Sequence, residues 1–180
     1  MLDYFIKGGF LMYPLLACSL AGTALLINKF LQYRRVLRQL DRPLDQVEKD
    51  PPPVLTPILE TLRAGGREKD LSLVGTRQVR ELEKGLSWLG LIATIAPLLG
   101  LTGTVTGMIK AFMVMAESTA VSPAMLAGGI WEALITTAAG LLIAIPVHIG
   151  HHYQEKQADE IAFVMKEIIL GLMQRKANGI

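Results

Sequence analysis

The chain has 180 residues, of which 51% are hydrophobic and 19% are charged. Soluble domains usually carry about a quarter charged residues, so this composition argues against a soluble domain. The formal net charge of +2 is too small to indicate a nucleic-acid partner. The chain has no Walker loop, dinucleotide glycine pattern, HExxH or GxSxG motif, and we therefore predict no enzyme activity, no catalytic residue and no cofactor.

The apolar residues are gathered into long uncharged runs. Residues 8–28 and 85–109 contain no charge, and residues 118–150 contain only Glu132. A bilayer core of about 30 Å needs about 20 apolar residues in a helix, and each run meets that length. The runs are apolar all round, whereas the helices of a soluble bundle would be apolar on one stripe. We therefore predict an all-α membrane protein with three transmembrane helices and long cytoplasmic helical extensions.

The basic residues indicate an orientation. Eleven of the 18 Lys and Arg residues lie in 31–85 and four lie after His151, whereas the connector between the second and third runs has none. Cytoplasmic loops are enriched in Lys and Arg. We therefore expect a multi-pass membrane protein, in contact with membrane lipids, whose N-terminus lies outside the cytoplasm and whose C-terminus is cytoplasmic.

These patterns divide the chain into six segments. They are an interfacial segment with the first transmembrane helix (1–30), a cytoplasmic helical loop (31–85), the second transmembrane helix (86–117), a periplasmic turn (118–124), the third transmembrane helix (125–150) and a cytoplasmic amphipathic helix (151–180).

The cytoplasmic segments carry their own patterns. Asp70 is a plausible N-cap, and apolar residues at helical spacing then lead from Leu71 into the second apolar run, which predicts one long helix. In the tail, Ile161, Met165, Ile168 and related residues form an apolar stripe. One copy of the chain is expected to bury that stripe poorly, which favours self-association.

The second transmembrane segment contains helix-kinking and close-packing residues. Pro97 removes a backbone donor inside the helix and is expected to kink it. Gly103 and Gly107 form a GxxxG pair that favours close helix packing. Thr104 is adjacent to that face and can bond its own helix, a neighbour or water. Lys110 is near the outer end and can extend to the interface, so it is not assigned to a site.

The third segment holds the ionisable residue. Glu132 lies eight residues beyond Ala124, where the helical segment is expected to begin, and an intramembrane carboxylate indicates a functional site by default. Thr137 and Gly140 follow on a small, weakly polar stripe, and Pro146 is expected to bend the inner end. One carboxylate per chain is not a complete proton path, which indicates several copies and a partner with another titratable group.

The remaining candidates for chemistry are weaker. Cys18 is the single cysteine, which excludes a disulfide framework. The sequence that ends at Cys18 resembles a lipoprotein processing site, but no cluster of basic residues precedes it, so we do not predict lipidation. Of His148, His151 and His152, the last two are adjacent and do not share a helix face, so we interpret all three as interfacial residues and predict no metal site.

Two stretches resemble the ExbB/TolQ/MotA proton-channel family, and ExbB and TolQ most. Residues 96–108, APLLGLTGTVTGM, resemble the second transmembrane helix of that family. The third transmembrane helix of the family is matched by three short stretches, IWEAL at 130–134, TAAGL at 137–141 and AIP at 144–146. The resemblance covers roughly residues 8–175, including the topology.

The resemblance implies a proton-channel (stator) subunit of an inner-membrane motor complex that uses the proton motive force to energise TonB- or Tol-dependent transport or envelope processes. It implies a pentamer around a dimer of a single-span ExbD- or TolR-like subunit, acting on a TonB- or TolA-like energy transducer. Thr104 and Thr137 match the pore-facing threonines of the family, and Glu132 matches its membrane glutamate. The Thr136–Thr137 pair replaces a common Ala-Thr, which leaves two candidates for the pore-facing hydroxyl. The alternative function is a non-conducting membrane scaffold subunit.

Overall fold

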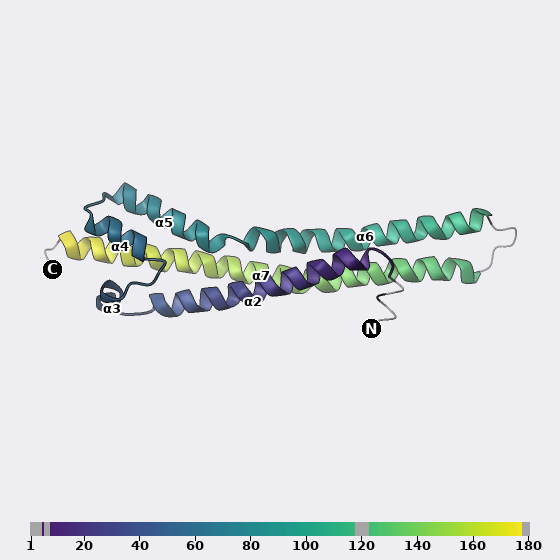
Figure 1. The fold of residues 1–180 in the computed structure, drawn as a ribbon, viewed down its shortest axis with the longest axis horizontal. Coiled ribbons are helices and arrows are strands. Elements are labelled where there is room, and N and C mark those ends of the chain that lie inside the picture. Colours follow the sequence, from purple (N-terminus) through teal and green to yellow (C-terminus); the bar gives the residue numbers. More distant parts are fainter. Residues whose placement is uncertain (1–4, 6–7, 118–122, 178–180) are drawn as a thin grey trace. The chain divides into compact units, whose positions relative to one another are not determined.

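The computed structural model describes residues 5, 8–117 and 123–177, and all regular secondary structure in them is helical (Figure 1). The helices are α2 (Met12–Leu40), α3 (Leu44–Lys49), α4 (Thr56–Arg63), α5 (Glu68–Glu83), α6 (Leu86–Glu117) and α7 (Pro123–Ala177). Three stretches are long and apolar enough to cross a membrane, one in α2, one in α5–α6 and one in α7. The prediction of an all-helical chain with three candidate spans is confirmed. The predicted interfacial segment before residue 8 and the 118–122 part of the predicted turn lie outside the described residues.

The chain forms two compact units. The first, here called the apolar unit, combines the residues up to Leu26 with Trp88–His151. The second, here called the charged unit, combines Ile27–Ser87 with the residues from His152 onward. The helices α2 and α7 contribute to both units because each continues past the end of its apolar run.

The apolar unit is held together by small residues. Its buried centre is formed by Leu15, Ala96 and Ala144, one from each of α2, α6 and α7. Gly22 of α2 faces Val147 of α7, because a Cβ atom at position 22 would lie 2.9 Å from a Val147 methyl carbon. Without a hydrophobic driving force between helices in lipid, such small residues allow the close contact that holds the helices together.

The charged unit buries the apolar stripe of the tail. Ile161, Met165, Ile168 and Leu172 of α7 are all buried within the single chain. Gly75 of α5 lies beside this stripe, since a Cβ atom there would be 3.8 Å from the Ile169 side chain. The expectation that one copy buries this stripe poorly is therefore wrong. The helix α5 contributes to the cover, so the stripe no longer argues for self-association.

The expectation of one long helix running from Asp70 into the second span is also wrong. The helix α5 ends at Glu83 and α6 begins at Leu86. Gly85 between them has φ +97°, in the left-handed region that glycine adopts readily. Near this break, the buried carbonyl oxygen of Leu82 accepts hydrogen bonds from Lys29 Nζ at 2.8 Å and Tyr33 Oη at 2.9 Å. The spacing of apolar residues continues across this break, because that spacing depends on which side chains are apolar and not on the backbone dihedral angles.

The start of α5 differs from the prediction by one turn. Arg67 precedes the helix, and Asp70 occupies its third position instead of the N-cap. The Asp70 carboxylate accepts a hydrogen bond from the Arg67 backbone N–H at 3.0 Å. The positive end of the helix dipole favours an acidic residue anywhere in the first turn. Aspartate therefore suits the third helical position as well as the expected N-cap position.

Candidate functional site

The site lies along the contact between α6 and α7 in the apolar unit. The two helices are antiparallel, because Gly107 faces Gly129 and Gly140 faces Ala96. A Cβ atom at position 140 would lie 2.6 Å from the Ala96 carbonyl oxygen, and one at position 107 would lie 3.0 Å from that of Gly129. Backbone therefore meets backbone along this line of contact, here called the glycine seam, and any polar side chain in it is closely surrounded.

Three threonines use their hydroxyls in different ways along the seam. Thr137 donates across it to the Gly100 carbonyl oxygen at 2.8 Å. Thr136 is only 1% exposed and donates to the Ala133 carbonyl oxygen of its own helix at 2.8 Å. Thr104 donates within α6 to the Leu101 carbonyl oxygen at 2.6 Å. Only the Thr137 hydroxyl joins the two helices.

Gly103 makes room for Thr136. A Cβ atom at position 103 would overlap the Thr136 hydroxyl oxygen and lie 2.5 Å from its Cβ atom. The buried hydroxyl of Thr136 therefore exists at this place only because residue 103 has no side chain. This is a direct reason for one glycine of the GxxxG pair, beyond the general preference for small residues in membrane helices.

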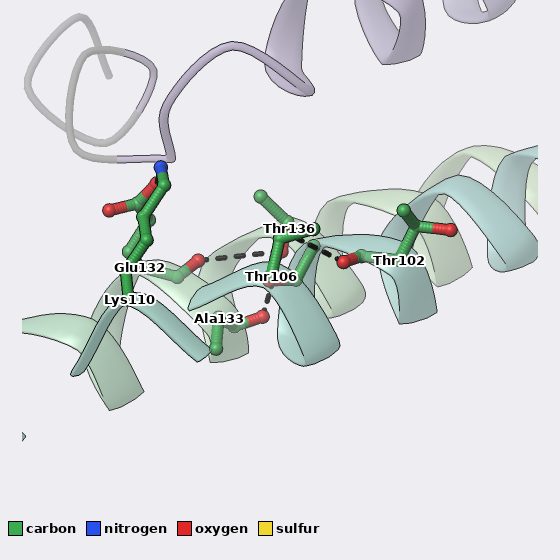
Figure 2. A network of polar contacts seen from close by, with 7 residues as sticks. Thr102, Thr106, Lys110, Glu132, Ala133 and Thr136 are labelled. Carbon is green, nitrogen blue, oxygen red and sulfur yellow. Dashed lines mark hydrogen bonds and ion pairs between the residues drawn. The ribbon is translucent and has the colours of Figure 1, made fainter. Parts of the chain in front are cut away.

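Glu132 forms an ion pair with Lys110. Lys110 Nζ of α6 lies 3.2 Å from Glu132 Oε1 of α7, with side-chain exposures of 64% and 30% in the single chain. Figure 2 shows the two side chains converging from the two helices, with Thr136 and Thr106 further along. The same carboxylate lies against Gly9, whose φ of +69° brings backbone close to it, and a Cβ atom there would overlap Glu132 Oε1. A charged group in this part of a membrane helix needs such a partner.

A cavity of about 300 Å³ opens beside this ion pair. Its polar lining comes from α6 and α7, and the segment preceding α2 supplies the rest; the lining residues are Gly8, Phe10, Leu11, Thr102, Gly103, Thr106, Lys110, Glu132 and Thr136. Thr106 donates to the Thr102 carbonyl oxygen at 2.9 Å, so its own oxygen retains acceptor capacity (Figure 2). The arrangement places hydroxyl, carboxylate and ammonium groups around a space that is large enough for water.

The structure divides the predicted site residues into two groups. Glu132 lines the cavity, together with Gly103, whereas Thr104 and Thr137 are absent from its lining. Pro97 and Pro146 lie inside α6 and α7, which continue as helices through them. Sequence reasoning missed Lys110. The sequence did contain a signal for Lys110. In a hairpin of antiparallel helices, residues at similar distances from the turn lie side by side, and Lys110 and Glu132 are at similar distances from it.

In the described residues, three helical stretches could span a membrane, and a carboxylate and an ammonium group pair between two of them, which defines a polytopic membrane protein. The chain belongs to the MotA/TolQ/ExbB proton channel family, whose model matches residues 60–167. The matched region contains Thr104, Lys110, Glu132 and Thr137.

Curated relatives agree with this family. The Tol-Pal system protein TolQ of Haemophilus influenzae is 37% identical over 109 residues, covering 61% of this chain and 44% of the relative. The biopolymer transport protein exbB1 of Vibrio cholerae is 46% identical over 83 residues, covering 46% and 36%. The putative biopolymer transport protein ExbB-like 1 of Synechocystis is 30% identical over 203 residues, covering 94% and 78%. The chain thus spans less than half the length of the first two relatives.

Proposed function

We propose that the chain is a proton-conducting subunit of an inner-membrane complex that uses the proton motive force to energise TonB- or Tol-dependent transport or envelope processes. Family membership and the intramembrane carboxylate Glu132 support this proposal. The observation that carries it is the position of Glu132, a titratable group held between two apolar helices and open to a polar cavity. Intramembrane ionisable residues mark proton and ion pathways.

The two threonines of the proposed pathway have distinct surroundings. Thr137 joins α7 to α6 through Gly100 and remains partly exposed, whereas Thr136 is enclosed. This difference supports Thr137, not Thr136, as the hydroxyl facing the conducting path. Thr104 is partly exposed and one helical turn from Gly100. A hydroxyl that donates to a backbone carbonyl still accepts from water, which is what a proton path requires.

The proposed complex contains five copies of this chain around a dimer of a single-span ExbD- or TolR-like subunit. In the described part of the apolar unit, Glu117 is the only carboxylate besides Glu132, and it lies at the final residue of α6. A second carboxylate within the membrane would therefore come from the partner. The family resemblance supports the pentamer, a TonB- or TolA-like energy transducer and a periplasmic N-terminus, and the Lys and Arg distribution supports that same orientation.

A second candidate function is a non-conducting scaffold subunit. The ion pair between Lys110 and Glu132 favours it, because a carboxylate with a neutralising partner can act as a packing device. Under this alternative, the α6–α7 seam would serve assembly alone, and replacing Glu132 by its uncharged isostere would leave the complex unchanged in activity.

The deciding experiment measures proton flux into vesicles that contain the chain with its single-span partner. Glu132→Gln and Thr137→Ala are compared with wild type, and Thr94→Ala is the matched control. Thr94 lies in α6, and its hydroxyl donates within its own helix to the Gly90 carbonyl oxygen, so it is a threonine of an apolar run whose hydroxyl stays on its own helix. Partner-dependent flux that falls in both test variants and persists in Thr94→Ala supports the channel. Flux that is unchanged in both test variants, or that is absent from assembled wild-type complexes, supports the scaffold.

A further inference from the structure

The cavity beside Glu132 is lined by hydroxyls that can accept but no longer donate. Thr102 donates to the Leu98 carbonyl oxygen at 2.8 Å, and Thr106 donates to that of Thr102. Thr136 donates to Ala133 in the same way. A hydroxyl carries one donor and two acceptor lone pairs, so each of these oxygens still offers acceptors. A molecule that fits the cavity must therefore bring donors to the threonines.

Water meets this requirement and a lipid chain does not. At about 30 Å³ for each water in the liquid, a cavity of about 300 Å³ has room for several molecules. Water would donate to the threonine oxygens and to the Glu132 carboxylate, and it would accept from the Lys110 ammonium. Leaving charged and polar groups of this kind against hydrocarbon costs several kcal/mol for each group.

The cavity also has an apolar side. Phe10 and Leu11, which directly precede α2, form the apolar part of the lining. Gly9 allows backbone to lie directly against the Glu132 carboxylate. Every lining residue comes from the apolar unit, so a single chain supplies this whole lining.

We propose that this cavity is a hydrated access chamber inside each subunit, through which protons reach Glu132, and that Lys110 is the positioning residue that holds the Glu132 carboxylate in it. This inference rests on the proposed function. Water in the chamber delivers a proton to the Glu132 carboxylate, which later passes it to the titratable group of the partner subunit. Thr104 and Thr137 would then act after Glu132 and not before it, since they lie outside the chamber.

The first test is cysteine labelling in the assembled complex. Cys18, the only native cysteine, is replaced by Ser, and Thr106→Cys is compared with Val105→Cys, its neighbour at the same depth. The side chain of Val105 is exposed on the single chain but absent from the chamber lining. The probe is a membrane-impermeant cationic methanethiosulfonate. Thiolates form where water reaches, so we expect Thr106→Cys to react about tenfold faster or more than Val105→Cys.

Proton flux in the same vesicles gives the second readout. Labelling of Thr106→Cys is expected to block flux, because the adduct fills the chamber. Equal labelling rates at the two positions would overturn the hydrated chamber, and labelling without loss of flux would overturn its role as the route. A wild-type complex without flux would refute the proposed function, and the labelling rates would still decide whether the chamber is hydrated.

The positioning role of Lys110 is tested by a charge-conserving rescue. Lys110→Met removes the ion-pair partner of Glu132, and flux is expected to fall while the complex still assembles. Lys110→Arg keeps the positive charge at nearly the same reach, and flux is expected to return. Equal flux in Lys110→Met and wild type, or an Arg variant no better than the Met variant, would overturn this role.

Discussion

Replacing Gly140 by Ala tests whether the glycine seam holds the site together. The added Cβ atom would lie 2.6 Å from the Ala96 carbonyl oxygen and 3.2 Å from the Gly100 Cα atom. Both neighbours are backbone atoms of α6, so no side-chain rotation relieves the contact. The helices must separate at this point, one turn from the hydrogen bond between Thr137 and Gly100.

The cost is estimated against a matched control in the same helix. Gly128 is also in α7, and a Cβ atom there would have nothing within 4 Å. Both substitutions gain the same intrinsic helix propensity, about 1 kcal/mol. Their difference therefore isolates the packing cost, which is about 1–3 kcal/mol for one extra methyl in a closely packed interface.

The assay is thermal unfolding of the detergent-solubilised complex, followed by far-UV circular dichroism. For a chain of this size, 1 kcal/mol corresponds to roughly 2–4 °C in Tm. Gly140→Ala is expected to lower Tm by several degrees relative to Gly128→Ala. Equal Tm values for the two variants would refute the argument that backbone contact at position 140 sets the spacing of α6 and α7.

Three further variants test the contacts around the seam and the α5–α6 break. Tyr33→Phe removes the buried hydroxyl bonded to the Leu82 carbonyl oxygen, and a loss of about 1 kcal/mol in unfolding free energy is expected from chemical denaturation; an unchanged value would show that Lys29 alone satisfies the carbonyl. Gly85→Ala places a side chain at φ +97° and is expected to lower Tm at a cost of about 1–2 kcal/mol. Thr137→Val removes the hydrogen bond to the Gly100 carbonyl oxygen and is expected to lower the unfolding free energy by only about 0.6 kcal/mol. A large drop in proton flux with a small change in Tm would therefore show that the hydroxyl serves conduction and not packing.

The spans could be predicted from the sequence because they depend on composition. Uncharged runs long enough for a bilayer appear directly in the residues before Asn28, in 85–109 and in 118–150. The break between α5 and α6 could not be read in the same way. Gly85 is one glycine among 17, and only the contacts of Lys29 and Tyr33 with Leu82 distinguish it from glycines inside helices.

The sequence was enough to predict the ionisable residue of the site, but not which residues surround it. Glu132 is identified by its charge alone, since it is isolated in an apolar run. Lys110 looks like an interfacial residue until the pairing of α6 with α7 places it beside that carboxylate. The cover at Gly9 depends on the path of the chain before α2, which no local pattern determines.

The adjacent threonines at 136 and 137 connect the two polar regions of the apolar unit. Thr136 lines the cavity that contains Glu132, whereas Thr137 bonds Gly100 outside that cavity. Neighbouring residues of a helix point about 100° apart, so one pair can reach both sides of the seam. A proton that leaves Glu132 for the side of Thr104 and Thr137 must cross this closely packed line. Gly103 leaves space there for the Thr136 side chain, so in the proposed mechanism the crossing is narrow, and the seam would separate the access chamber from the conducting path.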